Sequence, residues 1–513
     1  MTLAELIAGA PVGRIHGAAA MEIGGLAYDS RRIRPGDLFF ATARDAARNR
    51  GHIDDALQRG ARAVVARAGA VETARPAFTL VECAEPRAVM AIAASRFFGA
   101  PSHRMDLIGV TGTSGKTTTT YLLAAIFAAA GRPCGVIGTI GVFVGGRKLQ
   151  SGLTTPESID FEAALAAMEG EGVKAAAAEI SSIGIAERRV DRLSFAACLF
   201  TNLGRDHLDY HGTLDAYFAA KLRLFTELLP ASVRGGAAAI ARGDDPYGRQ
   251  VLAASSSRKL SFGLDRSCDV FPESYRAGID GVRATLNALG RRFEISSPLL
   301  GEINLLNILG AAAVSVALGI EPEAVAEGVR RCPGAPGRLE AVAGPPGVKV
   351  LVDYAHKPDA LAAMLGALRA LGPRRLVCVF GCGGDRDRGK RPIMGAIAGR
   401  LADTAVLTSD NPRSEAPLRI IAEVEAGLGE CGLARIGEAA AARGERGYLV
   451  EPDRRGAIAI ALRIAEAGDI VVVAGKGHED YQLVAGRRLD FDDRAVVREL
   501  AARMGATEPS SAN

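Results

Sequence analysis

Residues 105–131 read MDLIGVTGTSGKTTTTYLLAAIFAAAG and decide the fold. The first eight residues predict a buried strand that enters a glycine-rich turn, and residues 117–131 predict a helix that ends at a Gly C-cap. Backbone N–H groups of such a turn, together with the helix N-terminus, form an anion site. Lys116 would neutralise a terminal phosphate, and the Thr117 hydroxyl is placed to bind Mg²⁺. The segment therefore predicts a phosphate loop of a compact kind, because Val110 occupies the place of the usual first glycine.

A turn that binds no ligand is the alternative interpretation of this segment. It is disfavoured because the strand, the glycines, the lysine, the threonine and the helix all occur in the required order.

Strand and helix patterns alternate along the rest of the chain. Further strands are predicted at 37–41, 61–66, 173–180 and 195–203, and a further helix at 214–229. This alternation is typical of an α/β fold with a parallel, doubly wound sheet. A Pro/Gly segment at 331–338 predicts a boundary, after which a second strand–helix series begins. We therefore expect three domains, at 1–104, 105–334 and 335–513.

Composition supports a folded enzyme and excludes several other classes. The 513 residues are 48% hydrophobic and 23% charged, which excludes disorder for most of the chain. A net charge of +4 is too balanced for a protein that mainly coats nucleic acid. The start of the chain lacks the pattern of a signal peptide, and no uncharged apolar run reaches about 18 residues, so no membrane segment is expected. The eight cysteines are scattered, which predicts neither a disulfide framework nor a zinc site and places the protein in the cytoplasm.

Two candidate metal ligands follow predicted strands. Glu179 ends VKAAAAEI, and His207 lies in TNLGRDHLDYHG. A carboxylate and a neutral imidazole at neighbouring strand ends can hold Mg²⁺ beside a phosphate. Glu179 alone would more often cap a helix or form a salt bridge, and His207 alone would be a hydrogen-bonded loop residue. Their joint position after a phosphate loop favours the metal.

Helical periodicity places Lys221 near one face with Tyr217 and Leu224. A lysine in such a position normally extends to solvent, and periodicity gives no reason to expect otherwise. Asn304 and Asn307 near the start of another helix could bind a base edge or cap the helix, and the cap is favoured.

Four strand ends in the last third carry polar, glycine-rich turns with arginines and carboxylates. They are 352–359, 381–387, 410–413 and 475–479. Each alone would be an ordinary loop. Together at one sheet edge they suit a zwitterionic ligand, because arginine binds a carboxylate bidentately and a carboxylate binds an ammonium group.

These segments together resemble the Mur ligase family, and within it the ligases that add meso-diaminopimelate to UDP-MurNAc-L-Ala-D-Glu. The resemblance covers residues 25 to 495 and includes TGTSGKTTT, LTTPE, AEISS, LLGEINLLN, PGRLE, VDYAHKPD, FGCGGDRDRGKRP, SDNPRSEAP and GKGHEDYQ. It implies an N-terminal UDP-binding domain, a central ATP-binding domain and a Rossmann-like C-terminal domain. It also implies a ligase of peptidoglycan precursor synthesis that uses ATP and Mg²⁺, forms an acyl phosphate and releases ADP and phosphate.

The resemblance also implies roles for individual residues. Lys116, Lys221 and His207 would be catalytic, with Lys221 carbamylated, and Thr117, Glu179 and His207 would bind the metal. The ATP-binding residues would be Gly112, Thr113, Ser114, Gly115, Lys116, Thr117, Thr118, Asn304, Arg338 and Asp353. The UDP-MurNAc-dipeptide would contact Tyr28, Ser30, Thr154, Thr155, Ser181, Glu187 and Arg189. The diaminopimelate would contact Arg386, Asp410, Asn411, Pro412, Arg413, Gly475 and Glu479.

Some positions depart from the family's usual pattern: Ile183, Glu187, Leu153 and the loop at 43–54. We expect a monomer whose partners are these small molecules, with no nucleic acid and no membrane. A folylpolyglutamate synthase would share the ATP loop but would not explain DNPRSEAP or YDSRRIRPGD. A non-catalytic nucleotide-binding regulator would not need the four polar strand ends.

Overall fold

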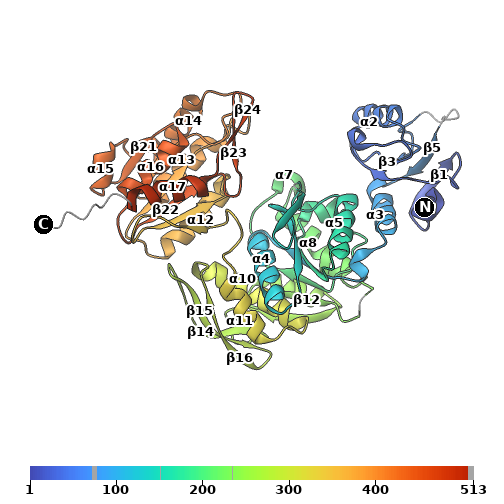
Figure 1. The fold of residues 1–513 in the computed structure, drawn as a ribbon, viewed down its shortest axis with the longest axis horizontal. Helices are drawn as coiled ribbons and strands as arrows, with labels where there is room; N and C mark the ends of the chain where they lie inside the picture. The colour runs from blue at the N-terminus through green and yellow to red at the C-terminus, as the bar shows by residue number, and fades with distance from the viewer. Residues whose placement is uncertain (72–77, 151, 234, 506–513) are drawn as a thin grey trace. The chain divides into compact units, whose positions relative to one another are not determined.

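The computed structural model describes residues 1–71, 78–150, 152–233 and 235–505 (Figure 1). Two compact units are formed. The first contains residues 1–275, 284–296 and 306–331, and the second contains 276–283, 297–305 and the chain from Cys332 onward. The second unit thus resumes inside the Pro/Gly segment, while the three domain limits given above stay a prediction.

A small five-stranded sheet opens the first unit. Its order is β1-β5-β4-β3-β2, parallel except for β1, which runs antiparallel to β5. The strands are β1 Val12–His16, β2 Leu26–Ala27, β3 Leu38–Phe40, β4 Ala63–Arg67 and β5 Thr79–Cys83. The helical segments are α1 Leu3–Ile7, η1 Ser30–Arg32, α2 Ala46–Gln58, α3 Pro86–Phe97 and η2 Pro101–His103. Helix α2 begins where the Asp45 side chain accepts the Arg48 N–H.

The larger sheet of the chain has eleven strands in the order β16-β15-β14-β13-β12-β11-β6-β10-β7-β8-β9. Its centre is parallel, with β6 between β10 and β11. The strands are β6 Asp106–Thr111, β7 Cys134–Gly138, β8 Gly141–Val144, β9 Arg147–Gln150, β10 Ala175–Glu179, β11 Ala197–Phe200, β12 Ala238–Arg242, β13 Arg258–Phe262, β14 Val270–Gly278, β15 Gly281–Ala288 and β16 Arg291–Ser297. The parallel centre confirms the predicted doubly wound sheet, and it places the ends of β6, β10 and β11 side by side.

The helices of this part begin with α4, which ends as predicted at a left-handed glycine, Gly131. The predicted helix 214–229 is instead α8 followed by a π-helical turn, η3. The elements are α4 Lys116–Ala129, α5 Ser158–Gly170, α6 Ser182–Ala186, α7 Leu208–His211, α8 Leu214–Arg223, η3 Leu224–Leu228, α9 Pro246–Ala254, α10 Gly301–Ala317 and α11 Pro322–Arg331.

The second unit contains a six-stranded sheet in the order β17-β18-β22-β19-β20-β21, parallel except for β17. The strands are β17 Glu340–Val342, β18 Lys349–Asp353, β19 Leu376–Phe380, β20 Thr404–Leu407, β21 Gly447–Val450 and β22 Ile470–Ala474. One face packs on α12 Pro358–Ala370, α13 Lys390–Leu401 and α14 Pro417–Glu430. The other packs on α15 Glu438–Ala442, α16 Arg454–Ile464 and α17 Asp493–Gly505. A hairpin of β23 Tyr481–Val484 and β24 Arg487–Asp490 completes the unit.

The α/β fold class is therefore confirmed. In the second unit, β18, β22, β19 and β20 are consecutive neighbours, so the four polar turns predicted from the sequence follow four adjacent strands at one edge.

Candidate functional site

The predicted phosphate loop lies between β6 and α4. Gly112 (φ 145°) and Gly115 (φ 86°) adopt backbone conformations that favour glycine. A Cβ at Gly112 would overlap Thr201 Oγ1, and one at Gly115 would overlap Asn307 Oδ1. The Ser114 N–H donates to the Asn202 side chain at 3.0 Å. The loop is therefore held by the end of β11 and by α10, as a preformed turn at a helix N-terminus.

Lys116 is the first residue of α4. Its Nζ donates to the carbonyl oxygens of Gly112 (2.8 Å) and Thr113 (3.0 Å). Thr117, which is buried, and Thr118 follow in the first helical turn. Both the helix dipole and the ammonium group favour an anion at this position.

Lys221 lies on α8 and is 1% exposed, so the expectation that it extends to solvent is wrong. Its Nζ donates to the Gly112 carbonyl at 2.9 Å and lies 4.4 Å from the centre of the Tyr217 ring. Burial, reinforced by the charge of Lys116, lowers the pKa of Lys221 well below its ordinary value. Lys116 donates to the same carbonyl, so the two amines lie close together at this point. The site therefore holds a buried amine, whose charged form is disfavoured, beside the phosphate loop.

Glu179 and His207 differ in their surroundings. Glu179 is buried at the end of β10, where its two oxygens accept the Thr139 N–H (2.9 Å) and hydroxyl (3.2 Å). His207 precedes α7 in a left-handed conformation (φ 53°), and its ring centre lies 6.1 Å from that of Tyr217. No group of three or more His, Cys, Asp or Glu side chains that could hold a metal occurs among the described residues.

A cavity of about 180 Å³ in the first unit is lined by Tyr28, Arg32, Leu153, Asp160 and other residues. The Tyr28 hydroxyl donates to Asp160, and Arg32 Nη1 donates to the same carboxylate at 2.9 Å. Burial and the Asp160 hydrogen bond raise the pKa of Tyr28. The cavity therefore has a polar wall that joins the first sheet to α5.

Ser30 does not line this cavity. It is buried, and its side chain is hydrogen-bonded to Asp55.

Thr155 connects three of the predicted segments. Its hydroxyl donates to the Glu179 carbonyl (2.8 Å) and accepts the Ser181 N–H (2.9 Å). Thr154 Oγ1 lies 3.1 Å from Thr139 Oγ1. The residues 154, 155 and 181, which the resemblance assigns to one substrate, are thus brought together at the end of β10.

Arg189 lies beside a buried carboxylate. Its Nη1 donates to the Thr155 carbonyl at 3.1 Å, and its Nε is 3.1 Å from Glu157 Oε1. Glu157 is 4% exposed and also accepts two 2.8 Å bonds from Arg87 Nη1. Two arginines therefore share one carboxylate, and Arg189 adjoins the segment that contains Thr155.

Glu187 also lies between cations. It pairs with Arg44 and with Arg87 Nε (3.0 Å), and it accepts the Tyr210 hydroxyl. Burial raises the pKa of Glu187, but the Tyr210 bond and the two arginines outweigh burial and hold the pKa below its ordinary value. Two departures from the family pattern, Glu187 and the loop that carries Arg44, thus meet in one ion pair.

In the second unit, Asp353 ends β18. Its oxygens accept the Leu339 and Ala355 N–H groups, both at 2.8 Å, and burial raises its pKa. The Arg338 guanidinium lies over the Tyr354 ring, 5.1 Å from its centre. The structure therefore brings Asp353 and the residues around Arg338 together in one unit.

Asn304 lies inside α10, where its Nδ2 donates to the Leu300 carbonyl at 2.8 Å. A cap would accept N–H groups of the first turn, so the hypothesis that the Asn pair caps the helix is wrong for Asn304. Asn307 lies beside Gly115 of the phosphate loop instead.

The ends of β20 and β22 meet around a buried lysine. Lys476, which is 0% exposed, donates to Asn411 Oδ1 at 3.0 Å and lies 3.5 Å from Asp410 Oδ1. Asn411 Nδ2 in turn donates to Glu479 Oε2 at 3.0 Å. Burial lowers the pKa of Lys476 and raises the pKa of Glu479, while each moderates the other's shift. Gly475 lies beside Asp410 and has a backbone conformation that favours glycine (φ 119°).

Arg413 has a left-handed backbone (φ 53°), and its Nη1 donates to the Gly384 carbonyl at 2.7 Å. The Pro412 carbonyl lies against Gly384, because a Cβ at Gly384 would overlap that carbonyl oxygen. Arg386 is exposed in the neighbouring loop. The predicted diaminopimelate residues are therefore at one sheet edge, with Arg386 the least constrained.

Sequence reasoning missed several residues of these clusters. Lys476 lies inside the quoted GKGHEDYQ motif and could have been included from its position there. Glu157 likewise ends the quoted LTTPE motif. Arg87 and Asp160 carried no signal, and Arg87 is 70 residues away from its partner Glu157 in the chain.

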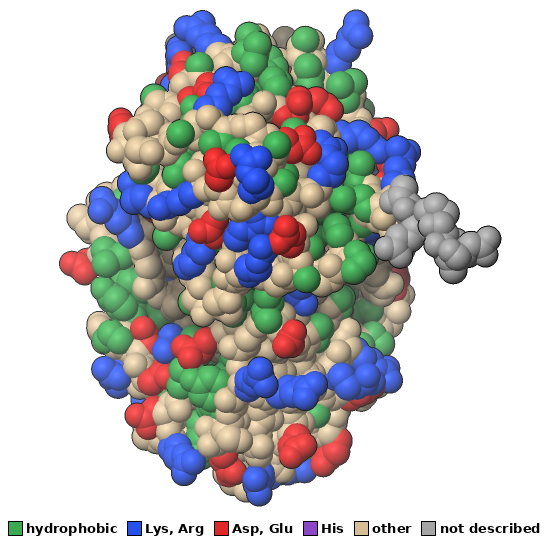
Figure 2. Space-filling model, turned by 90° about the vertical axis from the view of Figure 1, so that its left-hand side faces the viewer, with side chains coloured by type: hydrophobic (Ala, Val, Ile, Leu, Met, Phe, Trp, Pro, Cys, Tyr) green, Lys and Arg blue, Asp and Glu red, His purple; other side chains and the backbone are tan. Residues whose placement is uncertain are grey.

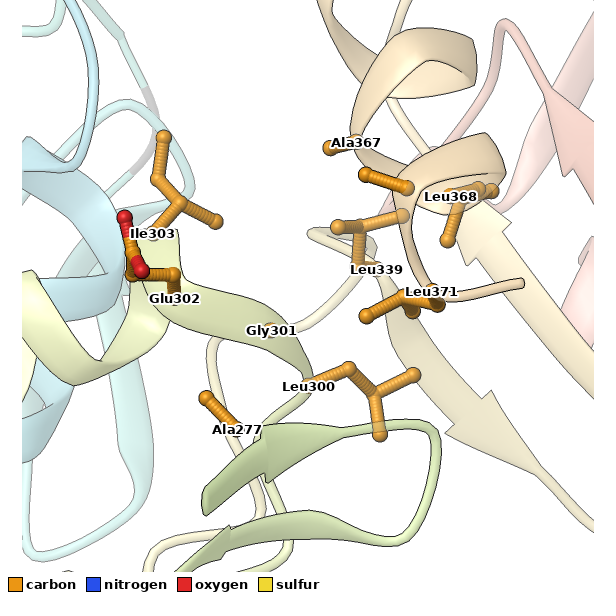
Figure 3. Close-up of a pocket in the computed structure, with 10 residues that line it drawn as sticks. Ala277, Leu300, Gly301, Glu302, Ile303, Leu339, Ala367, Leu368 and Leu371 are labelled. Atoms are coloured by element: carbon orange, nitrogen blue, oxygen red, sulfur yellow. The ribbon is translucent and has the colours of Figure 1, made fainter. Parts of the chain in front are cut away.

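A second cavity of about 330 Å³ belongs to the second unit (Figure 3). Its lining is mostly aliphatic, including Leu300, Leu339, Leu368 and Leu371, with Glu302 as the charged member. None of the predicted site residues lines it.

The surface fits the balanced composition. On the face in Figure 2, basic and acidic side chains are interspersed with apolar ones. In the described part of the chain, every helix is too short or too polar to cross a bilayer.

Comparison with known proteins places these motifs in a family. Residues 110–315 match the family model described as Mur ligase middle domain. Residues 337–477 match the model described as Mur ligase, glutamate ligase domain.

Curated relatives match nearly the whole chain. A Geobacter metallireducens protein is 42% identical over 496 residues, which cover 95% of this chain and 96% of that protein. A Solibacter usitatus protein is 43% identical over 95% of each chain. Both are named UDP-N-acetylmuramoyl-L-alanyl-D-glutamate–2,6-diaminopimelate ligase. A solved structure of a ligase with that name is 31% identical, covers 99% of this chain and 100% of its own, and has a TM-score of 0.68.

Proposed function

The chain belongs to the Mur ligase family, and we propose that it joins meso-diaminopimelate to the D-Glu γ-carboxylate of UDP-MurNAc-L-Ala-D-Glu. ATP is the second substrate and is converted to ADP and phosphate. The reaction is a cytoplasmic step of peptidoglycan precursor synthesis, which serves cell-wall growth, cell shape and division. The enzyme acts as a monomer on small molecules.

The observation that carries the proposal is the buried Lys221 amine at the phosphate loop, with Nζ 2.9 Å from the Gly112 carbonyl. A neutral amine can add carbon dioxide: an N–C bond forms, the nitrogen loses a proton, and a carbamate anion results. Lys221 would then supply carboxylate-like oxygens close to the Lys116 charge, which its low pKa favours.

The first chemical step activates a poor electrophile. An oxygen of the D-Glu γ-carboxylate forms a bond to the γ-phosphorus of ATP, and the bond from that phosphorus to the ADP oxygen breaks. Lys116 neutralises charge on the transferred group, and the N–H groups of the loop hold it in line. The product is an acyl phosphate and ADP.

The second step forms the amide. The amine of diaminopimelate attacks the acyl carbon, a C–N bond forms, the C–O bond to phosphate breaks, and the nitrogen loses a proton. Asp410, Asn411 and Glu479 orient the amino acid, and Arg413 offers a planar fork to its distal carboxylate. Pro412, Gly475 and Arg386 complete this subsite.

Magnesium would be held by Thr117, Glu179 and His207. The two oxygen donors suit the ion because Mg²⁺ prefers oxygen ligands. A carboxylate has about four acceptor positions, and the buried Glu179 uses two of them for Thr139, so positions remain for the ion. When bound, the ion would reduce phosphate charge.

Substrate binding is divided among the three domains proposed at 1–104, 105–334 and 335–513. The nucleotide contacts loop residues 112–118, Asn304, Arg338 and Asp353. The UDP-MurNAc-dipeptide contacts the residues at and near the 180 Å³ cavity, which are Tyr28, Ser30, Thr154, Thr155, Ser181, Glu187 and Arg189.

A product assay tests the function. Purified protein is incubated with UDP-MurNAc-L-Ala-D-Glu, ATP, magnesium and one amino acid from a panel. We expect ADP and a new amide only when the dipeptide substrate and meso-diaminopimelate are both present. Glutamate addition to a folate would instead support a folylpolyglutamate synthase, and absence of turnover with every amino acid would support a regulator.

A further inference from the structure

A fully buried arginine lies next to the turns of the second unit that carry the predicted diaminopimelate residues. Arg391, on α13, is 0% exposed. Its Nη1 donates to Glu415 (3.0 Å) and Glu423 (2.7 Å), and its Nη2 donates to Glu415 (2.8 Å) and to the Gly383 carbonyl (3.3 Å). Its hydrogen bonds hold the pKa of Glu415 at about 2, so the pair stays charged under working conditions.

Arg391 lies where two strand-end loops touch. The loop at 381–389 follows β19, and the loop at 408–416 follows β20. The Gly384 N–H donates to the Asn411 carbonyl at 2.9 Å. A Cβ at Gly381 would overlap the Thr408 carbonyl, so the two backbones approach more closely than other residues allow.

Two residues in these loops hold an unfavourable backbone conformation. Asp385 (φ 51°) and Arg413 (φ 53°) are left-handed without being glycine, which persists only where neighbouring groups enforce it. Asp385 accepts the Ser414 N–H (3.1 Å) and hydroxyl (2.7 Å), and its own N–H donates to Glu415 at 2.6 Å. Glu415 thus connects Arg391 to Asp385, one of the two strained residues.

The Gly383-Gly384 turn joins the buried arginine to the exposed site. The Gly383 carbonyl accepts Arg391 Nη2, and the next carbonyl accepts Arg413 Nη1. A shift of this turn would move the bonded guanidinium of Arg413 with it.

We propose that Arg391 is a positioning residue for amino-acid selection. Together with Glu415, it fixes the Gly383-Gly384 turn, and this turn fixes the orientation of the Arg413 guanidinium. This inference rests on the proposed function and deepens it. Arg391 contacts no substrate itself and acts through the turn. Its loss should therefore weaken use of diaminopimelate and spare the phosphate loop of the first unit.

The opposite edge of the same sheet offers a matched control. Arg375 immediately precedes β19 and is also buried. Its Nε and Nη2 donate to Asp469 at 3.0 and 2.7 Å, and its Nη1 and Nη2 donate to the Ala441 and Ile464 carbonyls. Arg375 has the same kind of partners as Arg391 but lies away from the polar turns.

The experiment compares Arg391→Lys with Arg375→Lys, because lysine keeps the charge but cannot bridge two acceptors as a fork. KM is measured for meso-diaminopimelate, ATP and UDP-MurNAc-L-Ala-D-Glu, together with Tm. For Arg391→Lys we expect KM for diaminopimelate to rise roughly tenfold to a hundredfold, with KM for ATP within about twofold. Arg375→Lys should lower Tm and leave all three KM values unchanged.

Unchanged KM for diaminopimelate in folded Arg391→Lys would overturn the proposal, and so would an equal rise in Arg375→Lys. If Arg391→Lys does not fold, Glu415→Gln decides. It keeps an acceptor for the Asp385 N–H and loses the charge, so a raised KM for diaminopimelate is expected and an unchanged one refutes the role. A wild-type protein that does not ligate diaminopimelate at all would instead refute the proposed function.

Discussion

Among individual residues, Lys221 is a buried side chain whose surroundings disfavour its charged form. An ammonium group in its place would lose its hydration and face the charge of Lys116. The chain therefore stabilises the neutral amine there, at a cost to folding wherever the unfolded lysine is protonated.

This cost predicts a pH dependence of stability. In carbon-dioxide-free buffer, unfolded Lys221 keeps its proton up to its ordinary pKa of 10.5, whereas folded Lys221 loses it at a lower pH. The unfolded state thus binds more protons, so stability rises with pH by up to about 1.4 kcal/mol per unit between the lowered pKa and 10.5. Chemical unfolding of wild type and Lys221→Met at several pH values measures this. Parallel stability curves would contradict a lowered pKa of Lys221 in the folded protein.

Lys116 has the opposite role, because its charge is needed. We expect Lys116→Ala to fold and to lose ligation by a factor on the order of 10²–10³ or more, since a phosphate-neutralising cation is removed. Steady-state ADP release measures the loss, and circular dichroism checks the fold. Near-wild-type turnover would refute the phosphate-loop assignment.

Among the secondary-structure elements, the ends of β7 and β10 place Glu179. A Cβ at Gly138, the last residue of β7, would overlap the Glu179 carboxylate, whose partner Thr139 follows directly. The strand end is thus shaped to hold one carboxylate in one position.

Gly138→Ala should therefore displace Glu179 and reduce turnover at least about tenfold while the sheet stays folded. Gly51→Ala is the matched control, because Gly51 lies inside α2 with open space around it. The control should keep full activity and gain about 0.5–1 kcal/mol of stability. Equal activity of the two variants would show that the position of Glu179 does not matter for turnover.

The sequence predicts best what is local to one element. The phosphate loop was predictable because its strand, turn and helix are contiguous, and the parallel sheet followed from their repetition. The added strands β8, β9 and β14–β16 and the π-helical turn were not predicted, because short alternating segments carry weak signals. The pairing of Arg44 with Glu187 joins residues 143 apart, and the burial of Lys221 depends on what packs over it, so neither had a local signal.

In the whole molecule, the candidate binding groups are divided between the two compact units. The phosphate loop, Lys221 and the cavity at Tyr28 belong to the first unit, and the Asp410–Arg413 turn with Glu479 belongs to the second. A substitution in the Asp410–Arg413 turn should therefore affect the use of diaminopimelate and leave the phosphate loop intact.

The preference for one amino acid over another tests most directly this division of the binding groups between the two units. Diaminopimelate has a distal carboxylate that L-lysine lacks, and a site that accepts it must replace its hydration with a cation of planar geometry. Arg413 makes no ion pair among the described residues; its Nη1 donates to the Gly384 carbonyl, so further donors of its fork can meet a carboxylate. L-Lysine would leave those donors without a carboxylate to bind, which weakens its binding relative to diaminopimelate. We therefore expect kcat/KM for meso-diaminopimelate to exceed that for L-lysine by at least about tenfold. We also expect Arg413→Ala to remove most of this preference while nucleotide affinity is retained.

Competition kinetics measure the preference for diaminopimelate, and ATP-binding titrations measure the nucleotide affinity. A kcat/KM for L-lysine that equals or exceeds that for diaminopimelate would refute the assignment of Arg413, because a fork aimed at a distal carboxylate cannot favour a substrate that has none.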